Sequence, residues 1–268
     1  MQAMDTAGAI AGPLIALLLV TGLHRDIRTV FWVAAIPGLL SIVVVALFAT
    51  ETRKKAVPAA ALGSATNPHA DVLNPGDLVR NPPAIPGSFY FVITAVGLFS
   101  LGASSDMFLV LRAQELGVAV AQAPLLGLVF NVVYTLASWP AGKLSDRVSK
   151  PLIAAAGYLV YAVTYAAFAT ALPKPFVWVM MGFYGLFYAL TSPVLRALIA
   201  ATVPPAVRGR ALGIYYFVSS ISMLLASVLT GTLWSWYGAA LPLGLCGGLA
   251  FIAALMLIVH HFRSATRG

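Results

Sequence analysis

The chain has 268 residues, of which 60% are hydrophobic and 9% charged, and its mean hydropathy is +0.93. A soluble domain of this length does not need so much apolar surface, so the composition predicts an all-α, polytopic bundle of transmembrane helices. The formal net charge is +8, but the basic residues lie mainly in predicted loops, which indicates membrane orientation and not a nucleic-acid partner.

Eight apolar stretches are long enough to cross a bilayer, because a span needs about 20 mostly apolar residues. They cover residues 7 to 23, 30 to 49, 87 to 111, 118 to 141, 151 to 172, 176 to 202, 211 to 234 and 239 to 260. Between the second and third lies a polar, proline-rich stretch that cannot bury a core and is predicted to be a linker. The expected regions are therefore residues 1–49, 50–86 and 87–268.

The first span carries small residues on one face, Gly8 and Gly12 among them, followed by Pro13. Small residues at this spacing favour close contact between membrane helices. The first two spans also show a weak likeness to the last two. Since transporters are commonly built from repeated halves, this likeness predicts that residues 1–49 are the end of a six-helix half whose first four helices are missing.

Asp106 follows about twenty apolar residues in the third span, and acids at such a depth usually face a cavity or a partner. Arg112 and Glu115 follow on the next turns. Two interpretations have equal weight. In one, Asp106 binds a cation or carries a proton, and Arg112 adjusts its affinity. In the other, Asp106 extends to the membrane surface while Arg112 and Glu115 form a surface pair.

Asn131 and Tyr134 give the fourth span a modest polar face, which makes them further candidates for a substrate or proton site. Tyrosines at positions 158, 161, 165, 184 and 188 add hydroxyl groups to the next two spans. Some of these are expected to line a cavity and most to form hydrogen bonds between helices. Arg196 lies late in the sixth span, and its depth favours an interfacial role over contact with an anionic substrate by two to one.

Residues 142 to 150 read Gly-Lys-Leu-Ser-Asp-Arg-Val-Ser-Lys and are predicted to form a charged hairpin between two spans. Gly142 would allow a tight exit from its helix. Asp146 would accept hydrogen bonds from free amides at a helix N-terminus. Arg147 and Lys150 would pair with Asp146 or face lipid headgroups.

The segment Gly142-Lys143-Leu144-Ser145-Asp146-Arg147 resembles the Gly-x-Leu-Ser/Ala-Asp-Arg signature of the major facilitator superfamily. That signature joins the second and third helices of a six-helix half, and it occupies this place after the linker. Gly8-x-x-x-Gly12-Pro13 resembles the Gly-Pro motif of the family's fifth helix, and residues 208 to 213 resemble the loop that enters the eleventh. Ser149 and Pro151 depart from the signature. The resemblance implies helices five to twelve of a twelve-helix fold.

The resemblance implies that Gly142, Leu144, Asp146, Arg147 and Lys150 form a cytoplasmic latch for one alternating-access state. The alternative is a solvated loop whose charges only follow the bias of basic residues toward the cytoplasm. The implied function is secondary transport of a small solute, with proton-coupled efflux as one form. The rival is a truncated, non-transporting membrane protein or sensor.

With eight spans both chain termini lie on one side, where eleven basic residues collect, against four on the other. The eleven are Arg53, Lys54, Lys55, Arg80, Lys143, Arg147, Lys150, Arg208, Arg210, Arg263 and Arg267. This distribution predicts a multi-pass protein of the cell (inner) membrane with both termini cytoplasmic.

Cofactor and metal chemistry find no support in the sequence. Cys246 is the single cysteine, and the four histidines follow no metal-binding pattern. A phosphate-binding loop and a nucleophile motif are also absent. We therefore expect no enzyme, cofactor or metal; the expected partners are the lipid bilayer, a small solute, protons and a missing N-terminal half.

Overall fold

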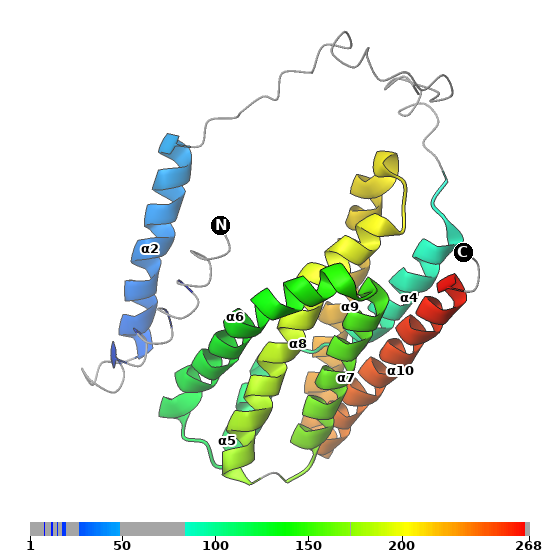
Figure 1. Ribbon diagram of the computed structural model, residues 1–268. Coiled ribbons are helices and arrows are strands. Elements are labelled where there is room, and N and C mark those ends of the chain that lie inside the picture. The colour runs from blue at the N-terminus through cyan, green and yellow to red at the C-terminus, as the bar shows by residue number, and fades with distance from the viewer. Residues whose placement is uncertain are drawn as a thin grey trace, which may run out of the picture.

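The computed structural model describes residues 27–48, 84–171 and 173–265, together with residues 8, 12, 15, 18 and 19 (Figure 1). The α-helices are α2 Ile27–Phe48, α4 Gly87–Gly102, α5 Met107–Glu115, α6 Ala123–Arg147, α7 Lys150–Ala169, α8 Lys174–Ala201, α9 Arg208–Tyr237 and α10 Ala240–Ala265. Two short 3-10 helices, Val120–Gln122 and Pro205–Val207, precede α6 and α9. Among the described residues there is no strand, so the predicted all-α fold class is confirmed.

Six helices in the described part of the chain are long and apolar enough to cross a membrane. They lie between residues 87 and 263, as the six spans predicted after the linker do. The predicted span 30–49 corresponds to α2, a separate apolar helix. The predicted span 7–23, including Pro13, and the linker 50–86 lie largely outside the described residues. Gly8 and Gly12 are described, and no described atom lies within 4 Å of a Cβ built on either.

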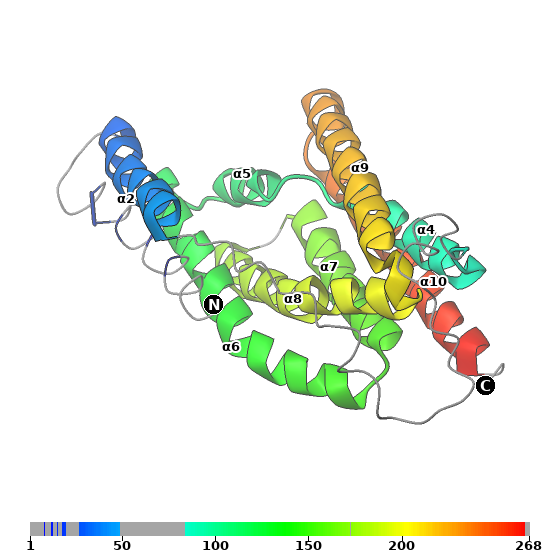
Figure 2. The same ribbon diagram turned by 90° about the horizontal axis from the view of Figure 1, so that it is seen from above.

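The third predicted span is not one continuous helix, which corrects the expectation for residues 87 to 111. Helix α4 ends at Gly102, and α5 begins at Met107. Figure 2 shows an extended connection that leads from α4 to a displaced α5. The connection reads Ala-Ser-Ser-Asp, and short polar side chains favour such a break because they compete for backbone hydrogen bonds. Sixteen residues of α4 span only about 24 Å, so α5 is needed to complete the crossing.

The predicted hairpin at residues 142 to 150 is also corrected. Helix α6 continues through Arg147, and α7 begins at Lys150, so the turn itself consists of Val148 and Ser149. Gly142 lies inside α6 and does not mark a helix exit. Asp146 lies in the last turn of α6 and not at a helix N-terminus. The charged segment is therefore a helix end followed by a two-residue turn.

The six-helix bundle is a chain of pairwise contacts. Helix α6 packs on α8, α8 on α7, α7 on α10, α10 on α4, and α4 on α9. Helix α9 also contacts α8, so α4, α7, α8 and α9 enclose a common space. The outermost helices α6 and α9 bury little of their surface, whereas α4, α7 and α8 each bury about half of their apolar window.

Two glycines set how closely the helices around α8 approach. A Cβ built on Gly185 would lie 2.5 Å from the carbonyl oxygen of Phe130 on α6. A Cβ on Gly157 of α7 would lie 2.5 Å from Cγ2 of Thr191 on α8. Only glycine permits these approaches, and they fix α8 against both neighbours.

Candidate functional site

A cavity of about 350 Å³ opens among α4, α7, α8 and α9. Its wall is largely aromatic, with rings from Phe99, four tyrosines of α7 and α8, Phe187, and two tyrosines of α9. Serine and threonine residues complete the lining. Asp106 and Arg196 are the two charged side chains in the lining that the structure describes. Small-molecule sites commonly combine a mostly apolar wall with a few polar groups in this way.

Asp106 lies at the helix break, immediately before α5. Its Oδ1 accepts a hydrogen bond of 2.6 Å from the hydroxyl of Tyr184. The hydroxyl of Tyr188 lies 3.2 Å from Oδ2 and 3.4 Å from Oδ1. Tyr184 and Tyr188 are four residues apart on α8 and therefore project from one face of that helix. The acid is thus held by two neutral donors.

The break itself is held by groups from α7 and α10. The hydroxyl of Tyr161 donates a 2.8 Å hydrogen bond to the carbonyl oxygen of Gly102, a group that the end of α4 would otherwise leave unpaired. A Cβ on Gly102 would lie 2.8 Å from the carbonyl oxygen of Cys246, so α4 and α10 are in close contact there. The position of Asp106 is therefore fixed from three helices.

The aromatic wall is one continuous cluster. The rings of Phe99 and Tyr158 stack with centroids 3.9 Å apart, and Tyr161 meets Phe99 edge to face at 5.0 Å. Phe187 joins Tyr161 at 4.9 Å and Tyr188 at 5.0 Å. The rings hold one another, so the wall is rigid around the carboxylate.

Two polar atoms in the lining have no hydrogen-bond partner among the described residues. They are the hydroxyl of Tyr158, whose side chain is fully buried, and Oγ of Ser219. An unpaired buried hydroxyl costs free energy unless another group satisfies it. Both atoms are themselves buried, so they lie behind the cavity surface and not on it.

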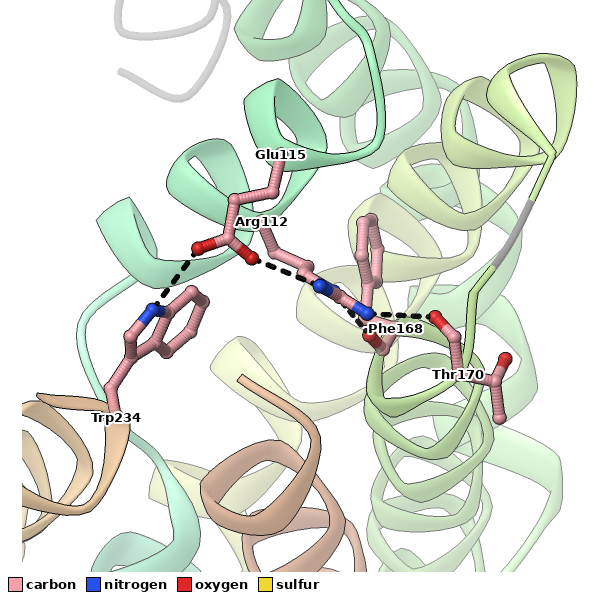
Figure 3. A network of polar contacts seen from close by, with 5 residues as sticks. All are labelled: Arg112, Glu115, Phe168, Thr170 and Trp234. Carbon is pink, nitrogen blue, oxygen red and sulfur yellow. Dashed lines mark hydrogen bonds and ion pairs between the residues drawn. The ribbon is translucent and has the colours of Figure 1, made fainter. Parts of the chain in front are cut away.

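Arg112 does not share the site of Asp106. Its guanidinium donates to the carbonyl oxygens of Phe168 at 3.0 Å and Thr170 at 3.1 Å, where α7 ends (Figure 3). It also pairs with Glu115 at 2.9 Å, and Glu115 accepts a 3.2 Å hydrogen bond from Nε1 of Trp234 on α9. A cation beside the last carbonyls of a helix satisfies unpaired acceptors. This cluster joins α5 to the ends of α7 and α9.

Asn131 and Tyr134 also lie outside the cavity lining. The side-chain amide of Asn131 donates to the carbonyl oxygen of Gly127 one turn earlier in α6. Tyr134 meets the ring of Tyr188 edge to face at 6.2 Å. Tyr134 therefore touches a residue that holds Asp106, whereas Asn131 bonds within its own helix.

The candidate latch residues cluster at the far end of α6 and the start of α7. Leu144, Asp146 and Arg147 are exposed, and Gly142 and Lys150 are half-buried. The ammonium of Lys143 lies 3.6 Å from the ring centroid of Trp139 one turn earlier. This cation–π contact holds one basic side chain of the segment along α6.

Several lining residues were missed by sequence reasoning. Phe99, Phe187 and Ser219 carry no motif, and Tyr215 and Tyr216 lie on α9, which is far from α4 in sequence. Arg196, given an interfacial role above, is exposed and lines the cavity. The tyrosine spacing on α8 was the available signal, since it places two hydroxyls on one helix face.

A search for relatives of the sequence gave a consistent result. The sequence pattern of the Major Facilitator Superfamily matches residues 95–267 of the chain. The chain belongs to this superfamily. A multi-pass membrane protein is therefore established from both the family and the six membrane-length helices among the described residues.

Two curated relatives are uncharacterized MFS-type transporters of Methanocaldococcus jannaschii. The first is 27% identical over 239 residues, which is 87% of this chain and 56% of the relative. The second is 29% identical over 150 residues, which is 54% of this chain and 37% of the relative. This superfamily member thus spans about half the length, or less, of the curated relatives it matches.

Proposed function

We propose that this chain forms the second half, and the end of the first half, of a secondary transporter that moves a small solute by alternating access. The observation that carries the proposal is the cavity of about 350 Å³, which places an intramembrane carboxylate among aromatic rings at a broken helix. Broken helices commonly form substrate and ion sites near the middle of transporter folds. Family membership and the similarity to two MFS-type transporters support the same interpretation.

Asp106 is the group proposed to contact the solute or a coupling proton. Charged side chains at membrane depth are costly and usually serve a transport path. The two tyrosine hydroxyls leave part of its acceptor capacity free, since a carboxylate offers about four acceptor sites and each hydroxyl donates one hydrogen. Proton-coupled efflux is one form that such a cycle would take.

The charged end of α6 is proposed to be a cytoplasmic latch in this cycle. The exposed charges of Asp146 and Arg147 lie beside a two-residue turn, where they can pair with another segment in one conformation and release it in the other. The proposal includes a cytoplasmic location for this turn and both chain termini, which the bias of basic residues toward cytoplasmic loops supports, in a protein of the cell membrane.

Reconstitution in liposomes tests the proposal. A chain in which four further membrane helices precede these 268 residues and complete the first half is compared with the 268-residue chain alone, using pyranine-loaded vesicles and a panel of amines, sugars and amino acids. We expect solute-dependent flux from the longer chain only, because the shorter chain supplies one full wall of the path. Flux from the 268-residue chain would contradict the division into halves. Absence of flux from a folded longer chain would favour the non-transporting remnant.

A further inference from the structure

We infer that the cavity takes a small organic cation, whose ammonium group lies against Asp106 and is surrounded by aromatic rings. The inference rests on the proposed function and assigns its substrate class. It requires a carboxylate with unused acceptor sites and a cavity wall suited to an organic cation.

The charge of Asp106 has no cationic counterpart among the described residues. Arg112 forms its ion pair with Glu115 and not with Asp106. Asp106 is held instead by the neutral hydroxyls of Tyr184 and Tyr188. About two of its acceptor sites remain for a ligand. A cationic ligand would therefore supply the missing charge, which an anionic or neutral ligand would not.

The wall around Asp106 favours an organic cation over a metal ion. Faces of aromatic rings attract ammonium groups, and clusters of such rings bind alkylated ammonium ions. Sodium and other hard cations need several oxygen ligands. Three backbone oxygens near the break already accept hydrogen bonds, that of Gly102 from Tyr161, that of Ser100 from the amide of Ala103 and that of Ser105 from the amide of Phe108. The described residues also contain no group of three or more metal-ligating side chains.

Arg196 limits the charge that the ligand carries. It lies eight residues after Tyr188 on α8, which is about 12 Å along the helix axis. A second positive charge extended toward that end of the cavity would meet the guanidinium. The lining therefore favours a ligand with one positive charge over a dication.

Choline is a suitable probe, because 3,3-dimethylbutan-1-ol has the same shape without the charge. Binding of radiolabelled choline is measured on the purified 268-residue chain in lipid nanodiscs, in potassium buffer. We expect saturable binding that unlabelled choline displaces at least ten times more effectively than the neutral alcohol. Sodium at equal concentration should displace little of it. Equal competition by the alcohol, or stronger competition by sodium, would overturn the inference.

Three variants complete the test. D106N should bind choline at least ten-fold more weakly, whereas D106E, which keeps the charge, should stay within about three-fold of the parent chain. K174Q removes an exposed charge at the start of α8, outside the cavity lining, and should leave binding unchanged. If D106N is poorly folded, D106E and the neutral alcohol still decide the question. A folded parent chain that binds no choline refutes the substrate class, whereas the proposed function fails only if the longer chain shows no flux of any solute.

Discussion

Asp106, in the third predicted span, and Arg112, just beyond its end, lie six residues apart, yet they belong to two different regions of the molecule. The cavity cluster consists of Asp106, Tyr184 and Tyr188, where a charge is held by neutral hydroxyls. The helix-end cluster consists of Arg112, Glu115 and Trp234, where a cation is paired with a carboxylate and with the carbonyls that end α7. Asp106 retains free acceptor sites, whereas the hydrogen bonds and the ion pair of Arg112 join helices to one another.

The difference arises from the break between α4 and α5. On an unbroken helix, positions 106 and 112 would be separated by about 9 Å along one axis. The break turns Asp106 toward α8, whereas Arg112 on α5 reaches the end of α7. We therefore expect substitutions in the helix-end cluster to affect stability, and substitution of Asp106 to affect ligand binding.

The largest loss of stability is expected from Gly185→Ala, which forces α8 away from α6. The added Cβ would meet the backbone of α6, 2.5 Å from the oxygen of Phe130 and 3.1 Å from the nitrogen of Tyr134. Backbone cannot yield as a flexible side chain can, so the cost should be about 3 kcal/mol. Thermal unfolding can be followed with a thiol-reactive dye, because Cys246, the single cysteine, is 4% exposed.

Gly182→Ala is the matched control on the same helix, since its Cβ would lie 3.6 Å from Cγ2 of Val133, an ordinary contact. Its stability should be unchanged or higher by up to about 1 kcal/mol, because alanine favours helix. Similar melting of the two variants would show that the close approach at Gly185 does not hold α8, and with it the two tyrosines, in place.

Arg112→Ala should lower stability by about 2 kcal/mol, because hydrogen bonds to charged groups contribute roughly 1.5–3 kcal/mol. The substitution leaves carbonyls of Phe168 and Thr170 without their donor and Glu115 without its ion pair. The side chain is only 16% exposed, so water replaces these bonds incompletely. The same dye assay measures the shift.

Arg210→Ala removes an exposed arginine and should melt like the parent chain. Choline affinity should also stay near the parent value in the folded Arg112→Ala protein. A large loss of affinity there would mean that the helix-end cluster and the cavity cluster are one functional unit.

Tyr184→Phe should have a smaller effect, about 1 kcal/mol, since it removes one hydrogen bond and keeps the ring. Tyr188→Phe should cost less, because its contacts to Asp106 are 3.2 and 3.4 Å long against 2.6 Å for Tyr184. Dye-monitored melting of both variants gives the order. The reverse order would mean that Tyr188 is the principal donor to the carboxylate.

The sequence predicted the helical class and the six later spans because apolar runs of membrane length are visible residue by residue. It also placed the signature segment between two spans, although Asp146 and Arg147 proved to be part of α6. The end of an apolar run does not mark the end of a helix, because the charged residues that follow it can continue the helix. The polar run from Ser104 to Asp106 did indicate the break between α4 and α5, but the apolar residues on both sides favoured one continuous span.

The candidate site was predictable only in part, because its members come from four helices. Asp106 could be selected from one property, its charge at membrane depth. Its tyrosine partners lie 78 and 82 residues later, and their contact depends on how α8 packs beside the break. Arg112 had two interpretations, one beside Asp106 and one paired with Glu115, and the structure contains the pair with Glu115.

Asp106→Asn should change stability least of all, by less than about 0.5 kcal/mol, while weakening choline binding at least ten-fold. The amide oxygen of asparagine can still accept from the two tyrosines, since both hydroxyls lie within reach of Oδ1. Removing a partly buried charge also lowers the cost of desolvation. Loss of choline affinity without loss of stability would show that Asp106 contacts the ligand and does not hold the fold. Arg112→Ala should instead lose stability and keep its choline affinity. If Asp106→Asn instead melts as early as Arg112→Ala, the acid holds the helix break together and the contrast between the two clusters fails.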